Sequence, residues 1–294
     1  WNVKKMAASS IKVPLIYLIA ADKEREGEML RALGRRYEFL TFVDTGALLH
    51  QVMIKRPAVI ICEDTAPPNG GNKFRERIRV DPDTHTGPII LTGNGSNVPK
   101  MNNVIDRYLL WPFKKSQIID CISDLINVAA EQQWEALPTL QKETLKLTVE
   151  EYQDVATAIE NGDPIDYHKA SDSCTPLVKA IQDNGHHELL KSVQNHHNYT
   201  YVHSLRVATL LTMFGHGIGM DEDNMNILAT GGLLHDVGKL VTPDNILNKP
   251  GKLDDEEWPI MQDHVVQSRD LLQAGDDVSK GAHIIAAQHH EKLD

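Results

Sequence analysis

The sequence predicts an α/β domain with a five-stranded parallel sheet, followed by an all-α domain. The chain has 294 residues, which is more than one typical domain and favours two domains of about 100 to 200 residues each. Short apolar runs alternate with amphipathic stretches as far as residue 128, and beyond it the patterns are helix-compatible. We therefore expect domains at 13–128 and 150–294, joined by a partly helical connector at 129–149.

Five short apolar runs in the first domain are predicted to be strands. They lie at residues 15–20, 39–43, 58–62, 89–92 and 108–110. The amphipathic helices expected between them and after the last one cover residues 24–35, 47–55, 73–80, 98–103 and 115–128. Continuously apolar strands that alternate with helices are typical of a parallel sheet covered on both faces. A small doubly wound domain is therefore expected.

The second domain reads as helices that are interrupted by three turn clusters, at residues 161–164, 215–223 and 242–252. One helix start is well marked. Asp254 is a candidate N-cap, and Glu257 follows three residues later with further acidic residues between them.

Composition excludes several classes of function. With 41% hydrophobic and 24% charged residues the chain can bury a core, and its 30 basic against 41 acidic residues give a net charge of −11. No basic arm is present, so DNA is not an expected partner. The longest apolar stretch, 13–21, is too short for a membrane span and carries no signal-peptide pattern. Three scattered cysteines without a CxxC motif favour the reducing cytoplasm.

Histidine is concentrated in the second domain, where 11 of the 14 histidines follow residue 185. Six residues there form a candidate metal-ligand set: His203, His235, Asp236, His264, His289 and His290. Imidazole and carboxylate together suit a divalent transition metal such as iron, manganese or zinc better than calcium or magnesium.

Their positions predict that these side chains point inward. Val207 and Leu210 lie four and seven residues after His203, which places His203 on the apolar face of its helix. Asp236 ends an apolar helix, where a carboxylate is costly unless it is paired or bound to a cation. The adjacent Gly231 and Gly232 would let another backbone approach closely.

A single histidine on an apolar face is more often a hydrogen-bonded core residue than a ligand. Five such histidines with a buried aspartate favour a metal, because packing neutral imidazoles together stabilises little unless something binds them. The other six histidines are expected at the surface: His186, His187, His196, His197, His216 and His283.

Several motifs occur in a fixed order along this region. They are YTxxHSxRVA from Tyr199, GLLHDVGK from Gly232, PxxILNKPGKL from Pro243, then His264, and finally HHE from His289. Over residues 189–294 the chain resembles the HD-GYP branch of the HD phosphohydrolases. The NKPGKL loop is peculiar to that branch. The resemblance implies a phosphodiesterase that acts on cyclic di-GMP, a bacterial second messenger.

The resemblance also implies how the metals are held. His203, His235 and Asp236 would hold one metal, and His264, His289 and His290 a second, with Asp236 bridging the two. Some members bind a third metal through a glutamate at the position of Tyr199, so two metals, iron or manganese, are expected here.

The chemistry is consistent with this assignment. Two metals about 4 Å apart can lower the pKa of water and neutralise charge on a phosphodiester. Asp236 and Lys239 are the candidate catalytic residues, and Lys239 could also contact phosphate as a point charge. Arg206, Lys249 and Lys252 are weaker candidates for substrate binding. For all four cations the alternative is an ordinary solvated side chain, since lysine also suits helix C-termini.

The sequence departs from the family pattern at its end. The Gly-Tyr-Pro loop and a later aspartate ligand would follow His290, but the sequence stops at Asp294. Together with a start at Trp1 rather than Met, this favours a helical domain truncated at its C-terminus, in a native protein that continues. A degenerate family member is the alternative.

The first domain resembles the flavodoxin-like receiver domain of response regulators. Residues 57–67 fit the third strand with its following loop, and residues 108–113 fit the segment that normally carries Lys-Pro. In this alignment the acidic pair falls on Ala21-Asp22, the phosphate acceptor on Glu63 and the lysine on Trp111, with Thr92 completing a degenerate site. We predict a pseudo-receiver that is not phosphorylated.

Glutamate cannot readily replace the acceptor aspartate, because its extra methylene moves the carboxylate. Glu63 could instead mimic the phosphorylated state or be an ordinary residue at a strand end, and Asp64 is the acceptor if the alignment is shifted by one. The expected role of this domain is contact with a protein partner or with a second copy of the chain.

Three functions remain open at this point. The leading one is a metal-dependent cyclic di-GMP phosphodiesterase that yields the linear dinucleotide or GMP. The second is an inactive signalling adaptor that binds metal or nucleotide and recruits partners, and the missing segment keeps it open. The third is an HD hydrolase for another nucleotide, which the NKPGKL loop disfavours.

Overall fold

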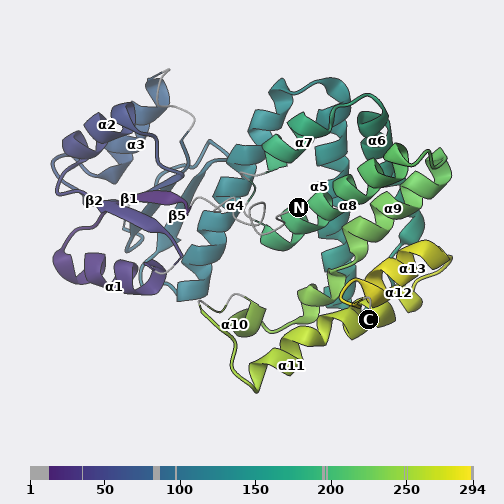
Figure 1. Ribbon diagram of the computed structural model, residues 1–294. Coiled ribbons are helices and arrows are strands. Elements are labelled where there is room, and N and C mark those ends of the chain that lie inside the picture. The colour runs from purple at the N-terminus through teal and green to yellow at the C-terminus, as the bar shows by residue number, and fades with distance from the viewer. Residues whose placement is uncertain are drawn as a thin grey trace, which may run out of the picture. The chain divides into compact units, whose positions relative to one another are not determined.

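The structure is a computed structural model that describes residues 13–34, 36–81, 87–96, 98–193, 196, 198–247, 249 and 251–292. It divides into two compact units, Trp1–Ala129 and Ala130–Asp294. The first contains the sheet and the second is helical (Figure 1). Among the described residues, no helix combines the length and apolar character that a membrane span requires.

The first unit is built on a five-stranded parallel sheet with the strand order β2-β1-β3-β4-β5. The strands are β1 (Leu15–Ile19), β2 (Glu38–Thr41), β3 (Val59–Glu63), β4 (Ile89–Gly93) and β5 (Asp106–Leu110). The helices are α1 (Lys23–Leu33), α2 (Thr45–Ile54), α3 (Gly71–Val80) and α4 (Lys115–Gln133). This strand order is that of flavodoxin-like doubly wound folds, so the predicted fold class is confirmed.

Both faces of the central strands β1, β3 and β4 are buried, which explains why their sequences are nearly continuous apolar runs. One face packs residues such as Ile16 and Ile61 against α1 and α4, and the other packs Tyr17 and Ile60 against α2 and α3. Alternate residues of a strand point to opposite faces, so each strand supplies both cores. The carboxyl ends of β1, β3 and β4 therefore meet at one edge, where the predicted receiver site lies.

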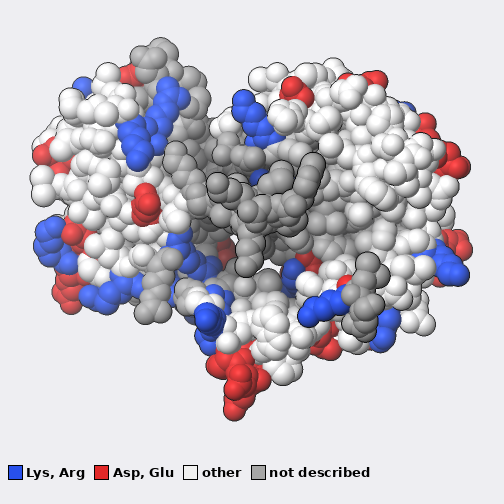
Figure 2. Space-filling model, viewed as in Figure 1, with Lys and Arg blue, Asp and Glu red and all other residues white. Residues whose placement is uncertain are grey.

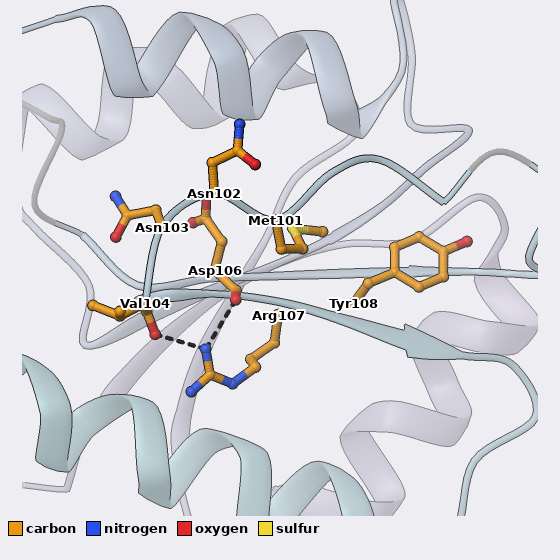
Figure 3. A pocket seen from close by; sticks show the side chains of 7 residues that line it. All are labelled: Met101, Asn102, Asn103, Val104, Asp106, Arg107 and Tyr108. Carbon is orange, nitrogen blue, oxygen red and sulfur yellow. Dashed lines mark hydrogen bonds between the residues drawn. The ribbon is translucent and has the colours of Figure 1, made fainter.

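The helix predicted at 98–103 is wrong. The described residues 98–105 contain no helix, and the chain passes from β4 to β5 as a loop. Val98 precedes Pro99, and proline disfavours the helical conformation of the residue before it. The same loop lines a cavity of about 410 Å³ at the start of β5 (Figure 3). Seven residues line it, and none belongs to the predicted sites: Met101, Asn102, Asn103, Val104, Asp106, Arg107 and Tyr108.

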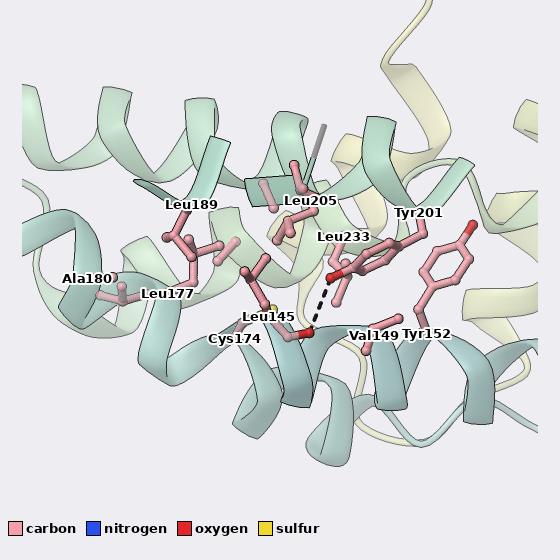
Figure 4. Packing of buried hydrophobic residues seen from close by; sticks show 14 of the residues in the cluster. Leu145, Val149, Tyr152, Cys174, Leu177, Ala180, Leu189, Tyr201, Leu205 and Leu233 are labelled. Atoms are coloured by element: carbon pink, nitrogen blue, oxygen red, sulfur yellow. Dashed lines mark hydrogen bonds between the residues drawn. The ribbon is translucent and has the colours of Figure 1, made fainter. Parts of the chain in front are cut away.

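The second unit is a bundle of helices. They are α5 (Thr139–Asn161), α6 (Tyr167–Gln182), α7 (His186–Ser192), α8 (Tyr199–Gly217), α9 (Glu222–Leu234), α10 (Asp244–Leu247), α11 (Glu257–Gln262), α12 (His264–Gln273) and α13 (Lys280–Gln288). The 3₁₀ helices η2 (Trp134–Ala136) and η4 (Val237–Val241) also belong to the described part of this unit. Residues 129–149 form the end of α4, η2 and the first half of α5. Their apolar side chains, Trp134 and Leu145 among them, enter the core of this unit (Figure 4).

Polar caps fix the starts of α8 and α13, two of the helices that carry predicted ligands. Asn198 accepts a hydrogen bond from the Tyr201 backbone N–H at the start of α8 (3.0 Å), and Ser279 accepts one at the start of α13. The box predicted before α11 is also confirmed. Asp254 Oδ1 accepts from the Glu257 N–H, and the Asp254 N–H donates to Glu257 Oε2, both at 3.0 Å.

His196 was expected at the surface, and the structure corrects this. Its side chain is only 6% exposed, its ring stacks on Trp134 at 5.7 Å, and Nε2 lies 3.0 Å from Glu131 Oε1. Both partners lie more than 60 positions earlier in the sequence. The polar residues around His196 therefore gave no local sign of burial. His197 lies outside the described residues.

We predict that Asp106→Ala destabilises the first unit by about 3–5 kcal/mol. Asp106 is buried at the start of β5 and pairs with Arg75 (3.2 Å) and Arg79 of α3, so its removal leaves two largely buried guanidinium groups without this carboxylate. Urea unfolding measures the change. Asp120→Ala, at an exposed position of α4, is the control and should change stability by less than about 0.5 kcal/mol. Equal stability of the two variants would contradict the prediction.

We predict that Gly232→Ala destabilises the helical unit by about 1–3 kcal/mol, because a Cβ there would lie 2.6 Å from the Ala208 Cα of α8. Thermal unfolding of this variant is compared with that of Gly217→Ala. A Cβ at Gly217 meets nothing within 4 Å, so that substitution should leave stability unchanged or raise it slightly. A Gly232→Ala variant as stable as wild type would show that the α8–α9 contact is looser than described.

Candidate metal centre

All six predicted ligands lie together in the helical unit, although they come from four parts of the chain. α8 supplies His203, the end of α9 supplies His235 and Asp236, α12 begins with His264, and α13 is followed by His289 and His290. Their ligand atoms form two groups, each with all atoms within 4.8 Å of one another. One group is His203, His235 and Asp236, and the other is His264, His289 and His290.

Asp236 lies between the two groups and is only 1% exposed. Its Oδ2 lies 3.3 Å from His203 Nε2 and 3.2 Å from His235 Nε2. Its Oδ1 lies 3.2 Å from His264 Nε2 and 3.5 Å from His289 Nε2. One carboxylate oxygen therefore faces each histidine group, which is the geometry of a bridging carboxylate.

Glycines let these helices approach closely. A Cβ at Gly231 would lie 3.0 Å from the Ala282 Cα of α13, and a Cβ at Gly238 would lie 2.1 Å from the His264 carbonyl oxygen. The Gly238 N–H also donates to Ser268 Oγ of α12 at 2.8 Å. The close approach expected at residues 231 and 232 is thus confirmed. The sequence gave no sign of Ser268, since one serine on a helix is unremarkable by itself.

The backbone fixes which nitrogen of three rings faces Asp236. In each ring Nδ1 contacts the carbonyl oxygen three residues earlier: His235 with Gly232 at 2.7 Å, His264 with Met261 at 2.6 Å, and His289 with Ala286 at 2.9 Å. A carbonyl oxygen only accepts hydrogen bonds, so Nδ1 carries the proton. In the neutral ring the lone pair is then on Nε2, which faces Asp236, as in metal-ligating histidines.

This arrangement needs a positive charge at its centre. Burial raises the pKa of Asp236, but hydrogen bonds and positive charge from the facing imidazoles of His235, His264 and His289 outweigh it and lower the pKa below its usual range when these rings are protonated on Nε2. When the rings are neutral, the buried Oδ1 accepts no hydrogen bond from any described residue, and the charge that keeps the carboxylate ionised must come from elsewhere. His264 Nε2 and His289 Nε2 lie 3.3 Å apart. Lone pairs at these distances repel one another unless a proton or a metal ion lies among them.

The pKa values of His203 and His290 favour a bound metal ion over additional protons at the centre. Burial lowers the pKa of His203 and of His290, although Asp236 acts in the opposite direction on both. Both rings are therefore mostly neutral at pH 7 and can offer a lone pair. Neutral imidazoles around one ionised, buried carboxylate are a donor set that fits divalent transition metals.

Lys239 is the one substrate-binding candidate placed in contact with a ligand. Its Nζ lies 2.5 Å from Asp236 Oδ2, and the side chain is 20% exposed. The ammonium thus partly neutralises the carboxylate while one side stays accessible. Arg206 lies three residues after His203 on α8, is partly buried, and forms no ion pair within the described part of the chain.

Lys249 and Lys252 make no described contact with any of the six candidate metal ligands. Lys249 forms ion pairs with Asp254 and Glu257, the residues that cap α11, and Lys252 is exposed. Acidic side chains gather at the tip of this segment in Figure 2. Lys249 therefore stabilises the loop before α11.

The residues predicted to form a degenerate receiver site lie at the carboxyl edge of the sheet. Glu63 ends β3, is 1% exposed, pairs with Arg25, and accepts the Ala21 N–H at 2.5 Å. The Arg25 guanidinium lies over the Trp111 ring, 5.4 Å from its centroid. Arg25 thus supplies a counter-charge to the carboxylate at the acceptor position, and the sequence comparison with receivers did not find it.

The other residues of the predicted receiver site, Asp22 and Thr92, and the alternative acceptor Asp64 do not contact Glu63 through their side chains in any described hydrogen bond. Asp22 caps α1 by accepting the Arg25 N–H at 2.9 Å, and Asp64 accepts the Tyr108 hydroxyl at 3.1 Å. Thr92 is buried, and its hydroxyl has no hydrogen-bond partner among the described residues.

The chain is similar to known phosphodiesterases. It is 39% identical over 109 residues to the 3'3'-cGAMP-specific phosphodiesterase 2 of Vibrio cholerae, covering 37% of this chain and 21% of that protein. It is 31% identical over 134 residues to a cyclic di-GMP phosphodiesterase of Pseudomonas aeruginosa, covering 45% and 32%. A cyclic di-GMP phosphodiesterase response regulator of Xanthomonas campestris is 33% identical over 91 residues, covering 30% and 24%. The matches span about a fifth to a third of these relatives.

Solved structures of receiver domains align with part of the chain. A putative response regulator of Chloroflexus aurantiacus is 23% identical, with a TM-score of 0.34, and covers 39% of this chain and 98% of its own. The receiver domain of a putative Luxo repressor of Vibrio parahaemolyticus is 13% identical, with a TM-score of 0.38, and covers 42% and 98%.

The family model described as HD domain matches residues 200–294, the segment that contains all six predicted ligands. Residues 200–294 of the chain are therefore similar to the HD domain family.

Proposed function

We propose that the chain is part of an HD-GYP-type, metal-dependent phosphodiesterase that hydrolyses cyclic di-GMP in bacterial second-messenger signalling. The observation that carries this proposal is the Asp236 carboxylate, buried between two histidine groups with one oxygen toward each. The names of the relatives, which include cyclic di-GMP phosphodiesterases, support the substrate class.

The centre fits two divalent transition metals, and we propose iron or manganese. His203 and His235 would hold one, His264, His289 and His290 the other, and Asp236 would bridge them. When bound, such a pair supplies Lewis acidity and activates water. The backbone carbonyls behind His235, His264 and His289 hold each ring in the tautomer that offers Nε2 to the metal.

We assign Lys239 to the phosphodiester. Asp236 fixes its ammonium beside the centre, and its exposed side can meet a phosphoryl oxygen as charge develops there. Arg206 is the second candidate because it follows His203 by one helical turn and has no acidic partner among the described residues. Lys249 is a weaker candidate, since its ammonium is occupied by two carboxylates, and Lys252 remains an exposed candidate.

For the N-terminal part we propose a regulatory pseudo-receiver at 13–128, joined through 129–149 to the helical domain at 150–294. The ion pair between Glu63 and Arg25 supports a site that takes no phosphoryl group. This domain would contact a protein partner or a second copy of the chain. The three free cysteines support action in the cytoplasm.

We predict that Asp236→Asn lowers metal affinity by more than about 100-fold and abolishes hydrolysis of cyclic di-GMP. The neutral amide removes the charge that balances two dications and offers a nitrogen where an oxygen ligand is needed. Metal content of the full-length protein by elemental analysis, together with a turnover assay with Mn²⁺ or Fe²⁺, measures both effects.

The matched control for this variant is His216→Ala, an exposed histidine on the same helix as His203, which should keep wild-type metal content and turnover. Wild-type protein that holds no metal would overturn the proposed centre. Wild-type protein with about two metals and no turnover would favour the signalling adaptor instead.

We also predict that the receiver-like domain gains no phosphoryl group from a small phosphodonor such as acetyl phosphate. Arg25 and the Ala21 N–H already occupy both oxygens of Glu63, and the lysine that would hold a phosphoryl group is replaced by Trp111. Intact-mass spectrometry of the protein after incubation checks this. A stable adduct on Glu63 or Asp64 would contradict the prediction.

A further inference from the structure

His196 is a buried histidine outside the metal centre that joins separate elements of the helical unit. Its ring lies between two aromatic side chains. It stacks on Trp134 of η2, with the ring planes 19° apart, and meets Tyr201 of α8 edge to face, with centroids 5.2 Å apart. Its Nε2 lies 3.0 Å from Glu131 Oε1, in the last turn of α4. One imidazole therefore contacts the end of α4, η2 and the start of α8.

The hydrogen bonds of this ring all run in one direction. The Asn198 backbone N–H donates to His196 Nδ1 at 3.3 Å, so Nδ1 offers a lone pair. The proton of the ring is then on Nε2, which donates to Glu131. Asn198 is the N-cap of α8, and its side-chain oxygen accepts the Tyr201 N–H at 3.0 Å. The cap of α8 is thus tied through His196 to a carboxylate on α4.

These contacts bear on the metal centre because His203 lies four residues after the start of α8. The first backbone N–H groups of a helix have no partner within it, and helix ends open readily unless a cap satisfies these groups. The side chain of His203 is 40% exposed, against 3% for that of His235. Packing therefore restrains the His203 ring less, and the path of the first turn of α8 decides where it lies relative to Asp236.

We propose that His196 is a positioning residue of the metal centre, which holds the start of α8, and with it His203, against the end of α4. Glu131 contributes by fixing the imidazole through its hydrogen bond. The first half of α4 packs on the sheet through Ile118 and Ile122, so a change in the first unit that moves α4 would reach the metal-binding helix at this contact. This inference rests on the proposed function, since it concerns the same centre.

The test separates the hydrogen bond of Glu131 from its charge, using isothermal titration of the full-length, metal-free protein with Mn²⁺ alone. Glu131→Ala and Glu131→Gln both lose the carboxylate charge, but glutamine keeps an oxygen that can accept from His196 Nε2. Glu131→Ala should lower Mn²⁺ affinity about 5-fold or more, as is typical of coupled sites, whereas Glu131→Gln should stay close to wild type. Glu143→Ala, which removes a carboxylate from an exposed position of α5, is the control and should keep wild-type affinity.

Hydrogen exchange supplies a readout that a purely structural contact would not change. Coupling between sites is reciprocal, so Mn²⁺ should slow amide exchange in residues 130–136 of the wild-type protein and of Glu131→Gln, but not of Glu131→Ala. His196→Asn is the second variant. The asparagine oxygen can still accept the Asn198 N–H, but the shorter side chain does not reach Glu131, so this variant should behave as Glu131→Ala does.

Wild-type Mn²⁺ affinity in a folded Glu131→Ala or, if that variant does not fold, in His196→Asn would overturn this inference and leave the proposed function standing. Equal weakening in Glu131→Ala and Glu131→Gln would also overturn it, because the lost charge rather than the hydrogen bond would then be the cause. The same holds if Mn²⁺ leaves exchange in residues 130–136 of the wild-type protein unaltered. Absence of Mn²⁺ binding by the wild-type protein would overturn the proposed function itself and the inference with it.

Discussion

The helical unit depends on keeping one carboxylate charged inside its core. Moving an ion out of water is costly unless it is paired, and Asp236 is almost completely buried at the junction of α9 and η4. α8, α12 and α13 each turn imidazole nitrogens toward it, and Lys239 adds an ammonium. Gly231, Gly232 and Gly238 are needed because only glycine lets these backbones come close enough. Packing and chemistry in this unit therefore follow from the same constraint.

The sequence predicted the parts of the fold that depend on local pattern. All five strands and the capping box before α11 were found, because burial on both faces and reciprocal caps leave a signature within a few residues. The errors fall where partners are distant or local propensity is weak. His196 lies among polar residues in the sequence, and only its contacts with Trp134 and Glu131 bury it. The loop after Val98 has a helix-like pattern, but Pro99 disfavours a helix there.

The same distinction holds within the two sites. The gathering of the candidate ligands at one place could be predicted because imidazole and carboxylate on apolar faces are unusual in themselves. Their supporting groups could not. Arg25 is an ordinary helical arginine until β3 brings Glu63 beside it, and Ser268 looks like any small polar residue of an amphipathic helix. What these residues do is decided by segments 30 or more residues away in the chain, which a local pattern does not record.

The two units solve the problem of a buried carboxylate in different ways, and the difference bears on what each can do. Glu63 is neutralised by Arg25, a charge that is part of the chain and does not leave, so this site has little reason to bind a further ion. Asp236 has only one ammonium and several neutral imidazoles, which leaves room for charge from solution. A carboxylate satisfied by its own chain is suited to a fixed structural state, whereas one that requires an exchangeable cation can support chemistry. The chemistry proposed for this chain therefore depends on Asp236.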